Sequence, residues 1–193
     1  MFVEDLIGNT PLVEVRHINT NPNVKIYCKL EGQNPGGSVK DRAAYGMISG
    51  ALKRGDIKKG DKLVEATSGN TGIALAMISR LLGLEMNLIM PDSATAERVK
   101  SMEAYGAKVI LTPAEQTIEH SRKVAEEMAE SGEYFMLNQF ANADNYNAHY
   151  KTTGPEIFKD TDGKITHFVS AMGTTGTIMG VSKYLKEQNP KIE

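Results

Sequence analysis

A lysine lies where a glycine-rich loop gives way to a predicted helix. The loop is Asn-Pro-Gly-Gly at 34–37, and Ser38 is the predicted N-cap of a helix that continues to about Lys53. Lys40 then lies in the first helical turn, where the positive end of the helix dipole disfavours an ammonium group. Such a lysine suits Schiff-base and general-base chemistry. The alternative is an ordinary surface lysine beside Asp41 in a capped helix, which is the commoner arrangement.

A second loop combines glycine and threonine at 173–177, with the sequence Gly-Thr-Thr-Gly-Thr. It follows a predicted strand and precedes a predicted helix, so several backbone N–H groups would point to one spot at the positive end of that helix. This arrangement suits a phosphate. The loop has the spacing of neither the dinucleotide-binding fingerprint nor the Walker motif. A tight turn without a ligand is the alternative.

A third loop, Thr-Ser-Gly-Asn-Thr-Gly at 67–72, has the same placement between strand and helix. Its hydroxyl, amide and backbone N–H groups suit a carboxylate, and an N-capped turn is the alternative. Ligands of open α/β sheets bind at the C-terminal ends of the strands, where both loops are expected. An amino-acid-converting cofactor with an aldehyde and a phosphate would use all three loops, and pyridoxal phosphate is that cofactor.

The elements that position these loops alternate regularly along the chain. We expect strands at 62–66, 86–90, 108–111 and 134–137, with helices between them at 73–82, 93–105 and 114–130. This alternation predicts consecutive βαβ units and a parallel sheet with right-handed crossovers. Short strands are expected at 12–15, 25–30 and 165–170, and a last helix at 178–187. The sequence therefore predicts an α/β protein.

The composition excludes several function classes. The 193 residues are 40% hydrophobic and 24% charged, and the net charge is −2, so no basic face indicates nucleic-acid binding. No apolar run is long enough to span a membrane, and the N-terminus lacks the features of a secretory signal, so we expect a cytoplasmic protein. Cys28 lies in an apolar run and is expected to be a structural thiol. Four histidines without ligand spacing are expected at the surface or in caps, with no metal site: His17, His120, His149 and His167.

Four motifs, in order along the chain, strongly resemble those of the cysteine synthases, also called O-acetylserine sulfhydrylases. They are Ile-Gly-Asn-Thr-Pro-Leu at 7–12, Asn-Pro-Gly-Gly-Ser-Val-Lys-Asp-Arg at 34–42, Glu-Ala-Thr-Ser-Gly-Asn-Thr-Gly at 65–72 and the loop at 173–177. This family belongs to the tryptophan-synthase-β-like class of pyridoxal phosphate enzymes. Together with the stretches at 148–157 and 165–170, the last loop looks more like the B isozymes than the A isozymes, which usually carry Gly-Thr-Gly-Gly-Thr there.

The resemblance implies the fold of fold-type II pyridoxal phosphate enzymes, with parallel sheets flanked by helices in two domains. Residues 38–140 would form the smaller βαβ domain with the substrate loop, and residues 1–37 and 141–193 would belong to the larger, cofactor-binding domain. Lys40 is similar to the lysine that binds the cofactor covalently, and Asn70 to the asparagine that binds its 3′-oxygen. The phosphate cup would be Gly173, Thr174, Thr175, Gly176 and Thr177. The substrate carboxylate would be held by Thr67, Ser68, Gly69, Thr71 and Gln139.

The implied reaction is a β-replacement that converts O-acetylserine and sulfide, or thiosulfate, into cysteine, or S-sulfocysteine, and acetate. Lys40 would remove the α-proton, and the implied assembly is a homodimer. Chains of this family are longer than this one, so we expect the larger domain to lack strands and the serine that contacts the pyridine nitrogen. The 193-residue chain would then be at most a weak catalyst. Two alternatives stay open: a related enzyme of the class, either a serine/threonine dehydratase or a cystathionine β-synthase, and a non-catalytic module.

Overall fold

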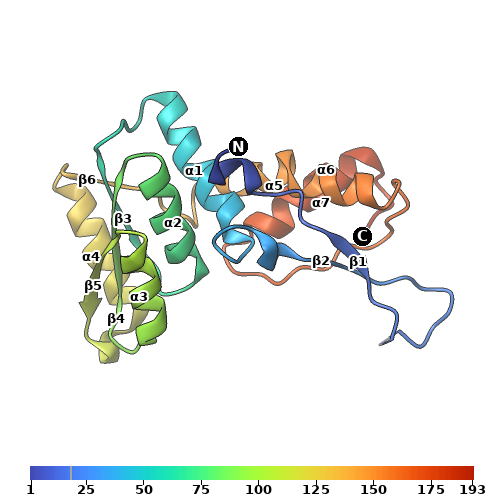
Figure 1. Cartoon of the computed structure of the whole chain (residues 1–193), viewed down its shortest axis with the longest axis horizontal. Coiled ribbons are helices and arrows are strands. Elements are labelled where there is room, and N and C mark those ends of the chain that lie inside the picture. Colours follow the sequence, from blue (N-terminus) through green and yellow to red (C-terminus); the bar gives the residue numbers. More distant parts are fainter. Residues whose placement is uncertain (18) are drawn as a thin grey trace.

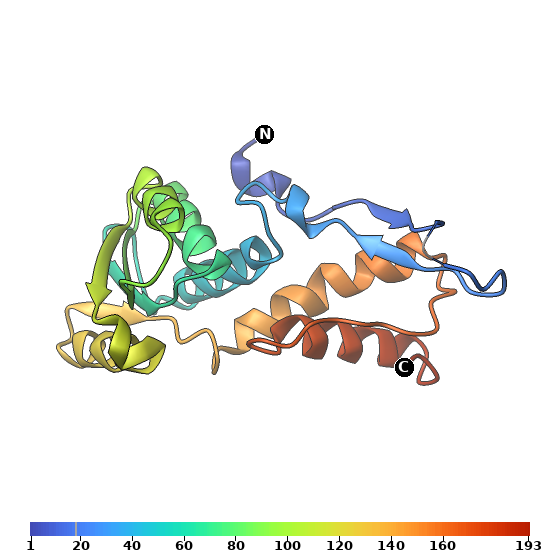
Figure 2. The same ribbon diagram turned by 90° about the horizontal axis from the view of Figure 1, so that it is seen from below.

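The computed structural model describes residues 1–17 and 19–193. The molecule is elongated: a parallel sheet with its helices lies at one end, and a β-hairpin with three further helices lies at the other (Figure 1). Helix α1 (Lys40–Arg54) lies between the two ends, and seen from below the segment after the sheet crosses from one end to the other (Figure 2). No helix in the described ranges is long and apolar enough to cross a membrane.

The sheet contains β3 (Lys62–Ala66), β4 (Glu85–Pro91), β5 (Lys108–Thr112) and β6 (Tyr134–Met136), all parallel and in the order β5-β4-β3-β6. The chain first moves outward from β3 to β5 and then returns to place β6 on the other side of β3. The strand order therefore reverses next to β3. The segments that leave the C-terminal ends of β3 and β6 diverge there, and such a switch point is where open α/β sheets bind ligands.

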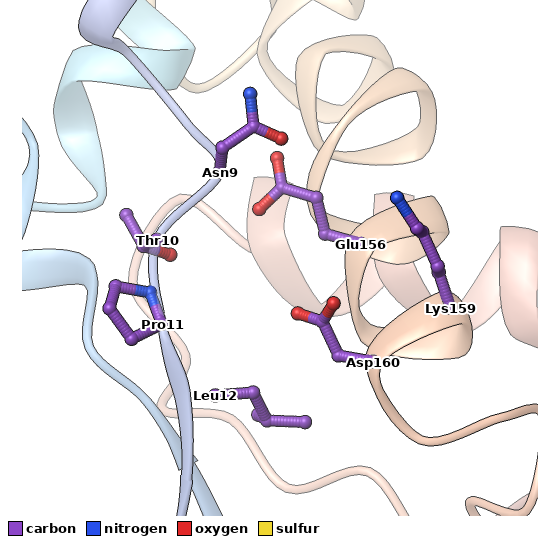
Figure 3. A pocket seen from close by; sticks show the side chains of 7 residues that line it. All are labelled: Asn9, Thr10, Pro11, Leu12, Glu156, Lys159 and Asp160. Atoms are coloured by element: carbon purple, nitrogen blue, oxygen red, sulfur yellow. The ribbon is translucent and has the colours of Figure 1, made fainter.

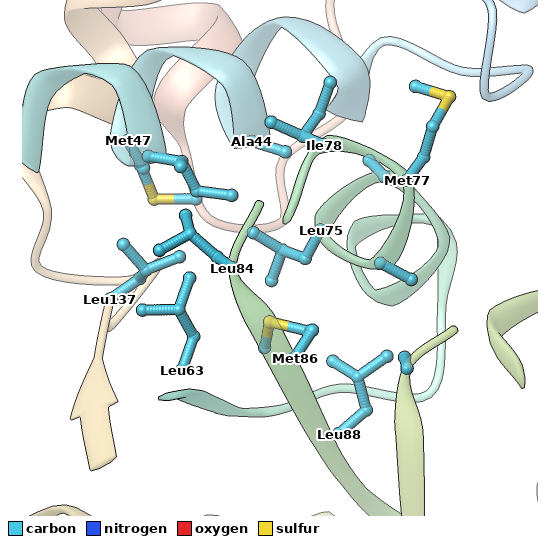
Figure 4. Close-up of a cluster of buried hydrophobic side chains, with 14 of the residues drawn as sticks. Ala44, Met47, Leu63, Leu75, Met77, Ile78, Leu84, Met86, Leu88 and Leu137 are labelled. Carbon is cyan, nitrogen blue, oxygen red and sulfur yellow. The ribbon is translucent and has the colours of Figure 1, made fainter. Parts of the chain in front are cut away.

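Helices cover both faces of the sheet. Helices α1, α2 (Asn70–Leu81) and α3 (Ala96–Ala104) share a hydrophobic core with one face, and that core contains Met47, Leu63, Leu75 and Leu88 (Figure 4). Helix α4 (Thr117–Glu130), which the 3-10 turn η3 (Ala114–Gln116) precedes, covers the other face through Ala125. Neighbouring residues of a strand point to opposite faces, so Leu63 packs in the first cluster and Val64 in the second.

The 3-10 turn η1 (Val3–Leu6) contacts α2, and the chain then reaches the other end of the molecule with the antiparallel strands β1 (Leu12–Glu14) and β2 (Tyr27–Lys29), followed by the turn η2 (Glu31–Gln33). Its helices are α5 (Ala143–Lys151), α6 (Thr153–Asp160) and α7 (Gly176–Gln188). A separate apolar cluster joins α6 to α7 through Ile157, Val181 and Leu185.

Helix α5 packs against both α1 and α7, and glycine makes both approaches close. A Cβ on Gly46 of α1 would lie 2.8 Å from the Cβ of Ala148, and a Cβ on Gly180 of α7 would overlap the carbonyl oxygen of Tyr146. Only a residue without a side chain permits these contacts. The two glycines thus let α5 pack closely against both α1 and α7.

The predicted strands and helices of the parallel sheet are confirmed to within a few residues. Two other expectations were wrong. Helix α1 begins at Lys40 with Val39 as its N-cap, and the Ser38 hydroxyl instead accepts a hydrogen bond from the Lys40 N–H at 3.2 Å. The stretch 165–170 forms no strand, because the described residues place no strand beside it; its backbone exchanges hydrogen bonds only with Glu193, and Val169 is 91% exposed.

Candidate active site

Lys40 is the first residue of α1, and it is half-buried. Its amine has no hydrogen-bond or ion-pair partner within 1–17 and 19–193, and burial lowers its pKa. The neighbouring Asp41 fixes the preceding loop, because its carboxylate accepts a hydrogen bond from the Gly36 N–H at 2.5 Å. A Cβ on Gly36 would lie 2.6 Å from that carboxylate, so the loop needs glycine there. The Lys40 amine is thus available to bind a ligand, as far as the described residues show.

The loop between β3 and α2 is rich in unused hydrogen-bond donors. Thr67 and Thr71 are buried, whereas Asn70, the first residue of α2, is exposed. The Thr67 hydroxyl accepts a weak hydrogen bond from the Gly69 N–H at 3.4 Å. The backbone N–H groups of Ser68, Asn70 and Thr71 have no acceptor in the part of the chain that the structure describes. Open donors at the start of a helix suit an anionic group such as a carboxylate.

Residues 137–142, the Gln139 segment, leave the sheet at the end of β6, beside that loop. Glu65 of β3, which is 1% exposed, fixes this segment: its carboxylate accepts hydrogen bonds from the N–H groups of Asn138 at 2.9 Å and Gln139 at 3.5 Å. Burial raises the pKa of Glu65 to about 7, although the two hydrogen bonds oppose this rise. Gln139 is thereby held at the switch point between β3 and β6.

Residues 173–177, which we call the phosphate loop after the ligand that the sequence predicts for it, lead into α7. Thr175 adopts a left-handed conformation with φ 63°, which is uncommon for a β-branched residue and is found at functional sites. The backbone N–H groups from Gly173 to Ile178 donate to no acceptor among the described residues. The positive end of α7 is therefore free to bind an anion.

His149 of α5 connects the phosphate loop to the start of α6. Its Nε2 lies 3.3 Å from the Thr177 hydroxyl, and its Nδ1 lies 2.9 Å from the Thr153 hydroxyl. Burial, together with the charges of Arg42 and Lys40, lowers the pKa of His149 to about 4, so the imidazole is neutral at neutral pH. The ring therefore contacts two segments at once, the start of α6 and the phosphate loop.

Two expectations about single residues were wrong. His149 was expected at the surface or in a cap, but it is 1% exposed, because α5 is covered by both α1 and α7. Cys28 was expected to be a structural thiol because it lies in an apolar run, but it is exposed on the short strand β2. Glu65 and Asn145 were missed altogether. A carboxylate inside the otherwise apolar strand at 62–66 was a signal that could have found Glu65.

A cavity of about 200 Å³ lies between the Gln139 segment and the phosphate loop, and Gln139, Asn145, Thr174 and Gly176 are among its lining residues. A larger cavity of about 450 Å³ lies between Asn9, Thr10 and α6 (Figure 3). No predicted site residue lines the larger cavity, and the carboxylate of its Glu156 already pairs with Arg42 at 2.6 Å and Lys29 at 2.7 Å. The smaller cavity is therefore the one that belongs to the candidate site. Lys40 and residues 67–71 are not among the residues that line either cavity. The described residues contain no cluster of three His, Cys, Asp or Glu side chains that could hold a metal ion.

Known proteins resemble this chain over nearly its whole length. Cysteine synthase B of Pseudomonas aeruginosa is 56% identical, and the match covers 99% of this chain and 64% of that protein. Cysteine synthase B of Escherichia coli K12 is 57% identical, over 98% of this chain and 63% of that protein. The expected resemblance to the B isozymes is confirmed. The chain spans about 64% of the length of the curated relatives that it matches.

Solved structures share the fold. A hydrogen sulfide-producing enzyme from Fusobacterium nucleatum superposes with a TM-score of 0.93 at 47% identity, covering 100% of this chain and 64% of that one. A cysteine synthase from Entamoeba histolytica gives 0.95 at 40% identity, covering 100% and 58%. Residues 3–193 match the family model described as pyridoxal-phosphate dependent enzyme. With its motifs, its parallel sheet and these relatives in agreement, the chain belongs to the family of pyridoxal-phosphate dependent enzymes.

Proposed function

We propose that this chain carries the active-site lysine and phosphate loop of a cysteine synthase, which makes cysteine and acetate from O-acetylserine and sulfide. The observation that carries the proposal is the half-buried amine of Lys40 at the start of α1, which has no partner among the described residues, together with the N–H groups at the start of α7, which have no acceptor there. The identity of 56–57% to cysteine synthases B supports the reaction class. Thiosulfate, with S-sulfocysteine as product, is the other sulfur donor that we propose.

The side chains and backbone groups present fit pyridoxal phosphate. Lys40 would bind its aldehyde covalently, Asn70 would bind its 3′-oxygen, and the phosphate loop would hold its phosphate through N–H groups that have no acceptor in the described ranges. When bound, the cofactor supplies an electron sink that stabilises negative charge at the α-carbon of an amino acid. The donors at Thr67–Thr71 and the side chain of Gln139 would orient the substrate carboxylate.

Lys40 is also the proposed base. Burial lowers the pKa of its amine, so a larger fraction of it is neutral and able to accept the α-proton at Nζ. His149 is a poorer candidate because both of its ring nitrogens already lie within hydrogen-bond distance of threonine hydroxyls. We assign it the role of orienting Thr177 at the phosphate loop.

The domain division and the setting of the protein are proposals as well. The separate apolar clusters support a smaller domain at 38–140 and a larger one made of 1–37 and 141–193. We propose a cytoplasmic homodimer that acts on small molecules and binds neither nucleic acid nor membrane. The net charge of −2 and the interspersed charges support this.

The first test is spectroscopic. Mixed with pyridoxal phosphate, the chain should develop a visible absorbance band. Borohydride should then fix the cofactor to Lys40, and peptide mass spectrometry would locate the adduct on that residue. Lys40→Ala should lose the band and the adduct. Lys53→Ala, an exposed position on the same helix, is the matched control and should keep both. A reducible adduct on another lysine would overturn the assignment.

A second test separates the proposed reaction from those of its class. The rate of cysteine formation from O-acetylserine and sulfide should exceed the rate of keto-acid formation from serine or threonine. It should also exceed the rate of cystathionine formation from serine and homocysteine. Keto-acid formation as the dominant activity would favour a dehydratase. A visible band without any turnover would favour the non-catalytic module.

A further inference from the structure

Asn145 touches both parts of the candidate site at once. This residue of α5 is 4% exposed, and its amide nitrogen donates two hydrogen bonds. One goes to the backbone carbonyl of Gln139 at 2.8 Å, and the other goes to the hydroxyl of Thr174 at 3.0 Å. Both hydrogens of the amide are therefore used, and one rigid planar group joins the Gln139 segment to the phosphate loop.

The start of α7 is packed against the same amide. A Cβ on Gly176 would overlap the oxygen of the Asn145 side chain, so the absence of a side chain at Gly176 is what admits the amide. At the start of α5, the Asn142 side chain caps the helix by accepting a hydrogen bond from the Asp144 N–H at 2.9 Å. Asn145 thus projects from a fixed helical turn and has little freedom to move away from either partner.

The connection continues into the sheet. Gln139 accepts from Asn145 through its carbonyl, and its N–H donates to Glu65 of β3. A series of hydrogen bonds therefore runs from β3 through Gln139 and Asn145 to Thr174. Asn145 is the member that contacts both segments.

We propose that Asn145 is a positioning residue that couples binding of a phosphate at the phosphate loop to ordering of the Gln139 segment. A phosphate that immobilises Thr174 also fixes the acceptor of one Asn145 hydrogen bond, and the amide then holds the Gln139 carbonyl more firmly. Part of the entropy cost of ordering Gln139 is thus met before a substrate carboxylate arrives. This inference rests on the proposed function for the identity of the two ligands, and the coupling itself rests on the contacts of Asn145.

Backbone hydrogen exchange, read by mass spectrometry with and without pyridoxal phosphate, tests the coupling. In the unaltered chain, the cofactor should slow exchange in peptides covering 173–178 and also in peptides covering 137–142. Pyridoxal, which lacks the phosphate, should not protect either peptide to the same extent. In Asn145→Asp, which keeps the size of the side chain but loses both donations, protection should appear at 173–178 only.

Two sets of variants separate coupling from a loss of stability. Asn147→Asp makes the same chemical change on the same helix, at a side chain that forms no hydrogen bond in the described part of the chain, and it should behave like the unaltered protein. If Asn145→Asp does not fold, Thr174→Val and Thr174→Ser replace it. Valine removes the Thr174 hydroxyl that accepts from Asn145 and, at a cofactor concentration that saturates the visible band, should abolish protection at 137–142, whereas serine keeps the hydroxyl and should retain it.

The outcomes distinguish this inference from the proposed function. The coupling is overturned if protection at 137–142 persists in Asn145→Asp and Thr174→Val. It is also overturned if that protection is absent from the unaltered chain while the visible band shows bound cofactor. If no visible band forms at all, the proposed function fails. The coupling is then decided without ligand: Asn145→Asp should speed exchange about threefold to tenfold at both segments, as the loss of a hydrogen bond implies. A change at only one segment, or an equal change in Asn147→Asp, refutes it.

Discussion

Buried ionisable side chains around the candidate site differ in how their charge is satisfied. Arg42 pairs with two carboxylates, whereas Lys40 has no partner within the described ranges, and burial lowers its pKa. Glu65 lies between these cases, since two backbone N–H groups donate hydrogen bonds to it but it forms no ion pair among the described residues. A buried group that is only partly compensated has a shifted pKa, and such groups cluster at functional sites.

Glu65 should give the stability of the protein a distinctive pH dependence. Its folded-state pKa of about 7 lies above the ordinary value of 4.5, so the native state binds this proton more tightly than the unfolded chain does. The contribution of Glu65 to the free energy of unfolding is therefore most favourable below pH 4.5, falls as the pH rises toward 7, and then levels off. The full change is on the order of 3 kcal/mol.

The test is urea denaturation of the unaltered chain and of Glu65→Gln between pH 4.5 and 8. As the pH rises, the free energy of unfolding of Glu65→Gln should increase relative to that of the unaltered chain. Glu103→Gln, at an exposed position of α3, measures the effect of the same change at the surface. Parallel curves for the unaltered chain and Glu65→Gln would show that burial does not shift the titration of Glu65.

At the scale of elements, the site depends on how close α7 comes to α5. Gly176→Val should weaken cofactor binding because the new side chain would collide with the Asn145 amide and move the start of α7. The apparent Kd for pyridoxal phosphate, measured by absorbance titration, should rise at least tenfold. Gly32→Ala, outside the phosphate loop, is the control, since a Cβ there would meet nothing nearer than 3.9 Å. An unchanged Kd in Gly176→Val would count against the phosphate-loop assignment.

The loop between β3 and α2 should act on substrate rather than on cofactor. Thr67→Ala removes a buried hydroxyl at this loop, which we expect to contact the substrate carboxylate. The O-acetylserine concentration needed for half-maximal spectral change should rise about fivefold to tenfold, as the loss of one hydrogen bond implies. The visible band of the bound cofactor should stay as it is. Loss of the band with unchanged substrate dependence would mean that the loop holds the cofactor.

At the scale of the whole molecule, one arginine joins three parts of the chain. Arg42 of α1 donates to Glu31 of η2 at 2.7 Å and to Glu156 of α6 at 2.6 Å, and its side chain is 1% exposed. Burial opposes ionisation of Glu156, but hydrogen bonds from Arg42 and Lys29 lower its pKa to about 2. This buried cluster ties the N-terminal segment and α6 to the helix that carries Lys40.

Removing that arginine should strongly destabilise the protein. Arg42→Met keeps much of the volume but leaves two partly buried carboxylates without their main partner, and such a loss costs about 3–5 kcal/mol in the free energy of unfolding. Arg54→Met is the matched control: Arg54 also links α1 to α5, through Asp144, but the pair lies in solvent and its loss should change little. Equal effects of the two substitutions in urea denaturation would refute the role of the buried cluster.

Local patterns were enough to determine the elements of the sheet and the three loops with candidate chemistry. Turn residues and apolar alternation are encoded within a few neighbouring positions, which is why β3 to β6, their helices and the place of Lys40 at the start of α1 followed from the sequence. The order β5-β4-β3-β6 did not, because pairing depends on which strands meet in space. The stretch 165–170 has a strand-like pattern, but a ladder needs a neighbouring strand.

Only the tertiary structure decided which side chains support the site. Glu65, Asn145 and His149 act through partners far along the chain, such as Asn138, Thr174 and Thr177. Such contacts carry no local sequence signal, because they arise when helices pack across glycines and strands align in a sheet. Burial likewise follows from packing, and so do the pKa values that burial shifts. The sequence alone therefore determined which candidate chemical groups the chain carries, and packing decided how those groups are held together.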